Sequence, residues 1–448
     1  MNLAEFRKNI WLHGSKLIFM VILGVYFMSL FMVYVMNSHE EFMTTAFLIS
    51  MISFVLTNTL WGSLIASTSV ISEVRNRTWI FQKMSALEAL DMCFGKLFGT
   101  TFHHWCLGLF FALMALLFSF GTEDHDVNLQ LLIMNMVVGT LLLQSMALNF
   151  SLLLIKRNQY KSDMGDLKSN QVIIALFVFF IIINSVLMID DDTSFTWYGM
   201  RVKNDIFNLI TLILFAGWSL LGFYRNMRDE LQYQSKPNAW LAFNFFIVLF
   251  YSGFVFNHFE YEMSDFKTYF VISYIALGIL TIVTLFLEPI DMMHYMRLYK
   301  DAKNRMFGKL YADMPLWIIS LVFTIVISVF LSVVLWKNGA GDEALFFMLP
   351  VVALLFFLKS LLVNLALHLL QVKRPTLLWG AYMVIWYMLL PGILAAMDLE
   401  DLSMLFWPIS PIVSGIAGII SLGVVSGLII SLIKKNQSIL SKGINQGE

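Results

Sequence analysis

Lys359 is the residue whose type and position most clearly suggest chemistry. It stands near the middle of an otherwise apolar stretch, residues 344–369, and a charge at the centre of a membrane-spanning helix is costly unless it is paired or hydrated. Its ammonium could contact an anionic group of a substrate, pair with a carboxylate of another helix or take part in proton-linked transport. A structural role, in which the side chain snorkels or bonds neighbouring carbonyls, carries equal weight.

Three neutral polar residues complete a candidate translocation path with Lys359. Gln144 is the counterpart of Lys359 in a pattern that recurs after 215 residues. Its two copies are Leu143-Gln144-Ser145, followed by Asn149, and Leu358-Lys359-Ser360, followed by Asn364. A path through both copies would be electrically asymmetric, and the two asparagines are expected to bond helix to helix rather than to bind substrate.

A second candidate site is a charged loop between the second and third apolar stretches. In chain order it holds Glu73, Arg75, Arg77, Trp79, Lys83 and Glu88. Ser85 and Glu88 have the spacing of a capping box, in which the serine hydroxyl accepts from the Glu88 amide and the carboxylate accepts from the Ser85 amide. This spacing predicts a short helix that begins at Ser85.

Motifs of known catalytic sites are absent from the sequence. There is no Gly-x-x-x-x-Gly-Lys-Ser/Thr phosphate loop, no His-Glu-x-x-His zinc helix, no Gly-x-Ser-x-Gly elbow and no dinucleotide-binding loop. Cys93 and Cys106 are too few for a disulfide framework and are not spaced as metal ligands. We therefore expect no enzyme, and no cofactor or metal in this chain.

The composition defines the elements that must position these residues. Hydrophobic residues make up 59% of the 448 residues, charged residues make up 13%, and the mean hydropathy is +0.77, as in a chain solvated by lipid. Apolar runs long enough to cross a bilayer predict an all-α protein with about twelve transmembrane helices. The runs lie near residues 17–36, 43–70, 97–120, 128–155, 171–189, 206–223, 239–256, 267–287, 314–336, 344–369, 376–396 and 409–433.

Basic residues indicate the orientation of these helices. With a cytoplasmic N-terminus, most of the 29 Lys and Arg residues fall on the cytoplasmic side, and those outside are Arg201, Lys203, Lys267 and Lys337. Cytoplasmic loops retain positive charge, so both termini are predicted to be cytoplasmic.

The segment before the first span, residues 1–16, has its own pattern. Leu3, Phe6 and Ile10 share one helical face, which predicts a helix lying in the membrane interface. A frayed tail is the alternative.

An internal repeat divides the chain. Phe94-Gly95-Lys96-Leu97, before the third span, recurs as Phe307-Gly308-Lys309-Leu310, before the ninth. The offset is 213 residues, close to that of the polar pattern. We therefore expect two six-span halves, residues 1–225 and 226–448, which enter the membrane the same way round because each has an even number of spans.

The loop from Glu73 to Leu97 resembles the membrane subunits of type-2 ATP-binding-cassette (ABC) exporters, in which an acidic and basic cytoplasmic helix leads to Gly-Lys-Leu before the third span. Trp407-Pro408-Ile409-Ser410-Pro411 is similar to that family's approach to its last span. The resemblance implies that the first-loop residues contact a cytoplasmic ABC ATPase subunit that binds ATP and magnesium. In the second half it implies the same role for Glu288, Arg297 and Arg305, although Pro289 and the missing capping sequence depart from the pattern.

The resemblance implies a permease of an exporter, with two six-span subunits fused in one chain. The substrate is unidentified, and an apolar or amphipathic cargo would suit the abundant Phe and Met residues. We expect an integral protein of a bacterial cytoplasmic membrane, in contact with lipid and with no nucleic acid. Two alternatives stay open: an autonomous secondary transporter of six plus six spans, and a membrane enzyme or scaffold that acts on lipid or polysaccharide.

Overall fold

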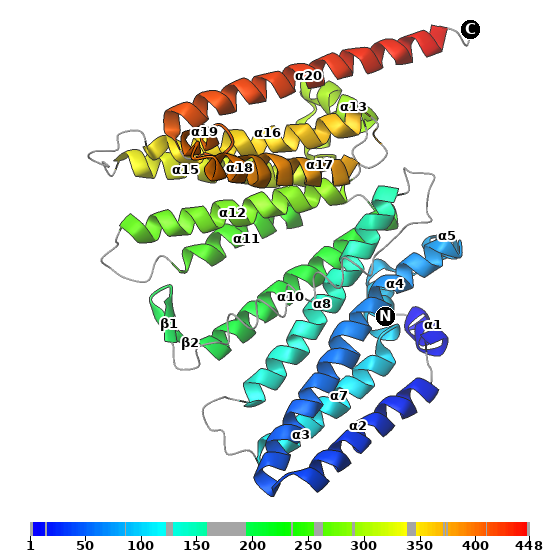
Figure 1. Cartoon of the computed structure of the whole chain (residues 1–448). Coiled ribbons are helices and arrows are strands. Elements are labelled where there is room, and N and C mark those ends of the chain that lie inside the picture. Colours follow the sequence, from blue (N-terminus) through cyan, green and yellow to red (C-terminus); the bar gives the residue numbers. More distant parts are fainter. Residues whose placement is uncertain are drawn as a thin grey trace. The chain divides into compact units, whose positions relative to one another are not determined.

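Long helices dominate the computed structural model of the chain (Figure 1). The structure describes residues 3–13, 16–85, 87–121, 129–158, 194–233, 236–254, 263–288, 292–337, 346–370, 372, 375–408 and 410–445. The expected span near 171–189 lies outside these residues.

The described helices have the length and composition of membrane spans. Within the described part of the chain, nine are long and apolar enough to cross a membrane, and Asn238–Ser252 and Val271–Leu287 are shorter apolar helices. The nine are Leu17–Met36, Glu41–Arg75, Phe102–Ser119, Gln130–Lys156, Asn204–Glu230, Leu316–Trp336, Leu349–Leu369, Leu377–Ala396 and Pro411–Ile433. The chain is therefore an all-α integral membrane protein.

Two compact units share the chain, residues 1–239 and 240–448. The expected boundary after residue 225 falls inside a helix that continues to Glu230. The first unit contains α1 (Ala4–His13), α2 (Lys16–Met36), α3 (His39–Phe54), the π-helical turn η1 (Val55–Trp61), α4 (Gly62–Arg75), α5 (Trp79–Lys83), α6 (Ala89–Phe94), the π-helical turn η2 (Gly95–Gly99), α7 (Phe102–Ser119), α8 (Leu129–Asn158), β1 (Ser194–Trp197), β2 (Met200–Lys203) and α10 (Asn204–Glu230).

The second unit begins inside α11 (Asn238–Ser252). It continues with α12 (Met263–Leu287), α13 (Met292–Lys303), α14 (Phe307–Ala312), α15 (Leu316–Lys337), η3 (Phe346–Met348), α16 (Leu349–Leu369), α17 (Pro375–Val384), the π-helical turn η4 (Ile385–Leu389), α18 (Leu390–Ala396), α19 (Glu400–Ser403) and α20 (Pro411–Asn445).

Helix pairs build each unit. In the first unit α8 packs against α10 and α4, and α3 packs against α7 (Figure 1). In the second, α12 packs against α15, and α16 packs against α20. A two-stranded antiparallel hairpin, β1 with β2, precedes α10. Its turn residues Tyr198 and Gly199 both have positive φ, as a type I′ turn requires.

One expected span is interrupted. The apolar stretch 376–396 forms α17, η4 and α18 in succession rather than one continuous α-helix. Pro391 explains the break, because a helical proline has no N–H and its ring clashes with the carbonyl four residues earlier, here that of Tyr387. This freed carbonyl accepts a hydrogen bond from the Trp407 indole at 2.8 Å.

Candidate functional site

A buried cluster of charges lies where the charged loop meets α1. Lys96, from η2, is completely buried, and its ammonium pairs with the carboxylates of Glu73 on α4 and Glu5 on α1, the latter at 3.0 Å. A buried lysine with two carboxylates has the pairing that such a charge requires.

Three further side chains complete this group. Lys8 Nζ lies 3.0 Å from Glu73 Oε1, and the Gln82 amide donates to the same oxygen at 2.7 Å. Asn9 donates to Glu5 Oε1 at 3.0 Å. We call Glu5, Lys8, Asn9, Glu73, Gln82 and Lys96 the Glu73 cluster. It fixes α1, α5 and η2 to the end of α4.

Close approach of α1 depends on the glycines of η2. A Cβ atom added at Gly95 would lie 2.7 Å from Glu5 Cγ and 3.0 Å from the backbone nitrogen of Phe6. The Gly95 carbonyl also accepts a hydrogen bond from Asn9 at 3.0 Å. The face of α1 that packs against the protein includes the buried polar residues Glu5 and Asn9 as well as Phe6, whose ring centre lies 5.4 Å from that of Phe94. The sequence had indicated only the apolar face with Phe6.

The charges around Glu5 alter its acidity. Burial alone would raise the pKa of this carboxyl, but the neighbouring Lys96 and Lys8 ammonium groups outweigh burial, and the pKa lies below the usual value of 4.5. Glu5 therefore remains ionised at neutral pH, as the pairing with Lys96 requires.

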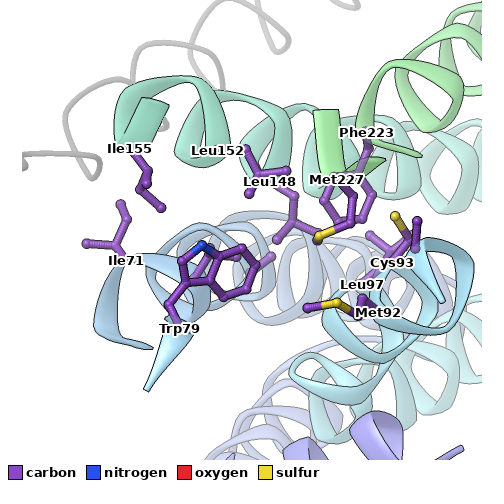
Figure 2. Packing of buried hydrophobic residues seen from close by; sticks show 13 residues of the cluster. Ile71, Trp79, Met92, Cys93, Leu97, Leu148, Leu152, Ile155, Phe223 and Met227 are labelled. Atoms are coloured by element: carbon purple, nitrogen blue, oxygen red, sulfur yellow. The ribbon is translucent and has the colours of Figure 1, made fainter. Parts of the chain in front are cut away.

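Trp79 anchors α5 in the hydrophobic core. The indole is buried among residues of α4, α6, α8 and α10 (Figure 2). The ammonium groups of Lys83 and Lys96 each lie 5.8 Å from the centre of its ring, within cation–π range. Lys83 also pairs with Glu230 at the end of α10. These contacts hold α5 in one position against three long helices.

The outer face of α5 is apolar. Ile80, Phe81 and Met84 are all more than 60% exposed. They sit on a helix that Trp79 and Glu73 hold in place, so this face is presented in a fixed geometry. We call these three residues the α5 face.

Of the six predicted first-loop residues, Glu73 belongs to the Glu73 cluster, and Trp79 contacts both Lys83 and the cluster residue Lys96. Arg75, Arg77 and Glu88 are exposed and lie outside the Glu73 cluster. Glu5, Lys8, Asn9, Gln82 and Glu230 were missed, and Lys96 was noted only as part of a repeated motif. Their signal was weak because each looks like an ordinary solvated polar residue near the end of an apolar stretch.

The predicted capping box is wrong. The helix begins at Ala89 with Glu88 as its N-cap, in an extended conformation. The Ser85 hydroxyl instead donates to the Gln82 carbonyl at 2.6 Å and so satisfies the C-terminal end of α5. A serine side chain can bond backbone groups at the start of a helix or at the end of one. Ser85 bonds the end of α5, so it does not begin the next helix.

The end of α4 has a left-handed residue. Arg77 has φ +59°, and the Thr78 amide donates to the Glu73 carbonyl at 2.9 Å, which is the bond pattern of a Schellman motif. Arg305 has φ +57° at the end of α13, where the Met306 amide donates to the Asp301 carbonyl at 2.9 Å. Two predicted arginines thus occupy the same backbone conformation in the two units.

Two substitutions of Arg77 remove the same charge but differ in the backbone strain that they leave at this position. Arg77→Gly is expected to stabilise the protein by about 1 kcal/mol, because glycine adopts positive φ without steric cost. Arg77→Val is expected to destabilise it by at least as much, since a β-branched residue fits that conformation poorly. Thermal unfolding in detergent compares the two variants. A glycine variant less stable than the valine variant would contradict this account of the turn.

In the second unit the predicted loop residues have different surroundings. Glu288 Oε1 accepts a hydrogen bond from the Leu316 amide at 2.8 Å and thereby caps α15. Burial raises the pKa of the nearby Tyr295 hydroxyl, on α13, to about 12. Arg297 and Arg305 are exposed. Lys309, the counterpart of Lys96, is exposed as well, so in the second unit this motif does not form a buried cluster.

Gln144 lies in a buried polar network at mid-span. Its carbonyl accepts from the Trp105 indole at 2.9 Å, and its amide donates to the Asn58 carbonyl at 3.0 Å. Asn58 belongs to the π-helical turn η1, whose wide turn leaves carbonyls available to side chains of other helices. Gln144 thus joins α8 to α7 and η1.

Asn149 joins α8 to α10. Its amide donates to the Ser219 carbonyl at 2.8 Å, and its own carbonyl accepts from Asn226 at 2.8 Å. Its neighbour Ser145 lies 2.7 Å from the Ser219 hydroxyl. Interhelical bonds of this type replace water as partners inside a bilayer.

Lys359 is enclosed by aromatic rings. Only 2% of it is exposed, and its ammonium lies 4.5 Å from the ring centre of Phe356, 4.8 Å from that of Trp386 and 5.3 Å from that of Tyr387. We call these four residues the Lys359 cage. Asn364, one turn further along α16, is fully buried, and its side-chain amide has no hydrogen-bond partner in the part of the chain that the structure describes.

The fold and the polar sites define an all-α integral membrane protein with a buried ionic cluster at one end of its first unit and a caged lysine within a span of its second. No known protein family, curated protein or solved structure matches the chain.

Proposed function

We propose that the chain is the permease of an ATP-driven exporter resembling the type-2 ABC transporters, and that a separate cytoplasmic ATPase binds it. The observation that carries this proposal is the α5 face: Ile80, Phe81 and Met84 are exposed on a short helix that a buried ion cluster and a buried tryptophan hold in place. Apolar residues at the basic end of a helical unit favour a protein partner over water.

The charge at this end of the first unit supports a cytoplasmic location. Arg75 and Arg77 are exposed beside the α5 face, and positive charge is retained in cytoplasmic loops. In the proposal both termini are cytoplasmic, and α1 lies in the membrane interface with Trp11 and Leu12 exposed towards lipid.

The pairing of helices supports two repeated halves with twelve spans in total. The second and third long helices of each unit pack together, as α3 with α7 and α12 with α15. The fourth and the last long helices also pack together, as α8 with α10 and α16 with α20. The left-handed Arg77 and Arg305 end helices in both loops.

The two loops differ in a way that bears on the ATPase. Lys96 is buried beneath α1, but Lys309 is exposed, and Glu288 caps a helix rather than joining an ion cluster. We therefore propose that the α5 face forms the main ATPase contact and that the second loop, with Arg297 and Arg305, forms a weaker one.

Affinity purification of the tagged chain from its native membrane tests the proposal. We expect a P-loop ATPase to co-purify with the wild type and to be lost from the double variant Phe81→Ser with Met84→Ser, because the apolar contact is removed while Trp79 and Glu73 remain. Phe120→Ser is the matched control: Phe120 is equally exposed, at the far end of α7. Absence of any ATPase from the wild-type sample would contradict the proposal.

An autonomous secondary transporter is the second candidate, because Lys359 is a buried charge within a span. Transport by the purified chain alone in liposomes, driven by a proton gradient without ATP, would favour it. The same measurement gives no transport if an ATPase supplies the energy.

A further inference from the structure

Gln144 and Lys359, which occupy the same place in the two copies of the mid-span pattern, differ in their hydrogen bonding. In the first unit every polar atom of the Gln144 side chain has a partner, supplied by Trp105 and Asn58. In the second unit Lys359 Nζ has no hydrogen-bond partner among the described residues, although the side chain is 2% exposed. An ammonium without a hydrogen-bond partner is costly in an apolar span. The site around Lys359 therefore lacks a hydrogen-bond partner of the kind that Gln144 has in the first unit.

The missing group must be an acceptor. The rings of Phe356, Trp386 and Tyr387 offer their π-electrons to the ammonium, but cation–π contacts leave N–H donors unused. The Trp386 indole N–H, in the same cage, also has no partner in the described residues. Two kinds of donor without a partner among the described residues thus lie in one cage that carries a positive charge, and this arrangement fits an anionic ligand.

The cage is held in position by its surroundings. The Tyr387 hydroxyl lies 2.7 Å from Ser360 Oγ, and Trp386 packs between Tyr382 and Phe406, at ring distances of 5.9 Å and 5.1 Å. The π-helical turn η4 carries Trp386 and Tyr387, two of the three aromatic residues of the cage, and α16 carries Phe356. The donors are therefore organised before a ligand arrives, which lowers the entropic cost of binding.

Lipid is the nearest source of such a ligand. Ile385, Met388 and Leu389 of η4 are all close to half exposed or more, and in a membrane protein exposed apolar side chains of a span meet acyl chains. A molecule that reaches Lys359 past η4 would therefore keep its apolar part in the hydrocarbon and bring only its charged group to the cage.

We propose that the Lys359 cage binds the phosphate or carboxylate headgroup of an anionic amphiphile that enters from the bilayer past η4. The ammonium supplies charge-assisted hydrogen bonds, and the Trp386 indole donates one more. The statement that this molecule is the cargo of the permease rests on the proposed function. The statement that it binds to the purified chain does not.

Binding to the purified full-length chain in neutral detergent tests the inference without an ATPase. The probes are dioleoylphosphatidylglycerol, palmitate, dioleoylphosphatidylcholine and inorganic phosphate, and affinity is measured by native mass spectrometry and by thermal shift. We expect at least one of the two anionic amphiphiles to bind, and Lys359→Gln to weaken it about tenfold or more. Trp386→Phe should weaken it less, because the ring remains and only the N–H is lost.

Two further variants keep the test decisive. Lys359→Arg retains the charge and should retain binding, whereas Lys309→Gln removes an exposed lysine of the same unit and should change nothing. Equal affinity for phosphatidylcholine, or anion binding unaffected by Lys359→Gln, would overturn the inference. If inorganic phosphate binds as strongly as the lipids, and its binding also depends on Lys359, the ligand need not be an amphiphile and that part of the inference is overturned. If the ATPase test fails while lipid binding succeeds, the ATP-driven permease proposal is wrong and the binding site at Lys359 stands.

Discussion

Glu73→Ala is expected to lower the free energy of unfolding by about 1–3 kcal/mol, the usual cost of leaving buried hydrogen-bonding groups without a partner, and less than the cost of leaving a buried charge wholly unpaired. Lys96 is completely buried, and without Glu73 it would retain Glu5 as its counter-charge. Lys8 and Gln82 would lose the acceptor that they share. The end of α4 would then no longer be fixed to α1 and α5.

Unfolding in mixed detergent, followed by tryptophan fluorescence, measures this change. Glu88→Ala is the matched control, because Glu88 is exposed in the same loop and its loss should change stability by no more than about 0.5 kcal/mol. In the double variant with Lys96→Met, removal of the cation should recover part of the loss, and the double-mutant cycle gives the coupling. Equal effects of Glu73→Ala and Glu88→Ala would show that the ion cluster contributes nothing to stability.

Gly95→Ala is expected to displace α1 and to destabilise the protein by about 1–3 kcal/mol, the usual cost of overpacking. The added methyl group would lie 2.7 Å from Glu5 Cγ and 3.0 Å from the Phe6 backbone nitrogen, and a backbone atom cannot move aside without moving the helix. Displacement of α1 would also separate Glu5 from Lys96.

Gly308→Ala is the control for this substitution. Gly308 occupies the same place in the second copy of the Phe-Gly-Lys-Leu motif, but no atom lies within 4 Å of an added Cβ. We expect this variant to be as stable as the wild type. Limited trypsin digestion at Arg7 and Lys8 reports on α1: cleavage should become faster in Gly95→Ala only. Unchanged cleavage in Gly95→Ala would contradict the packing described for α1.

Membrane spans could be predicted from the sequence because their cause is local. Twenty consecutive apolar residues cross a bilayer whatever their neighbours are, and the described long helices lie close to the expected runs. Pro391 is also a local signal, but the partner of the carbonyl that it frees is not local, since the Trp407 indole donates to the Tyr387 carbonyl. The count of twelve spans, the internal repeat and the cytoplasmic location of both termini stay predictions.

The chemistry of each polar residue could not be predicted in the same way. Lys96 and Lys309 stand in identical tetrapeptides, yet one is completely buried between two carboxylates and the other is exposed. Ser85 and Glu88 have capping-box spacing, yet the Ser85 hydroxyl bonds to the end of α5, and the Glu88 side chain makes no capping hydrogen bond to α6. A short motif gives no information about the residues from other helices that will contact it in the folded protein.

The sequence by itself determined that the protein is helical and embedded in a membrane, and it singled out Lys359 and the loop around Glu73. Only the tertiary structure decided which polar residues meet: Glu5 with Lys96, Gln144 with Asn58, and Lys359 with three aromatic rings. The physical reason is that span formation depends on hydrophobicity summed along a segment. Burial of a charge depends on partners that lie far away in the sequence.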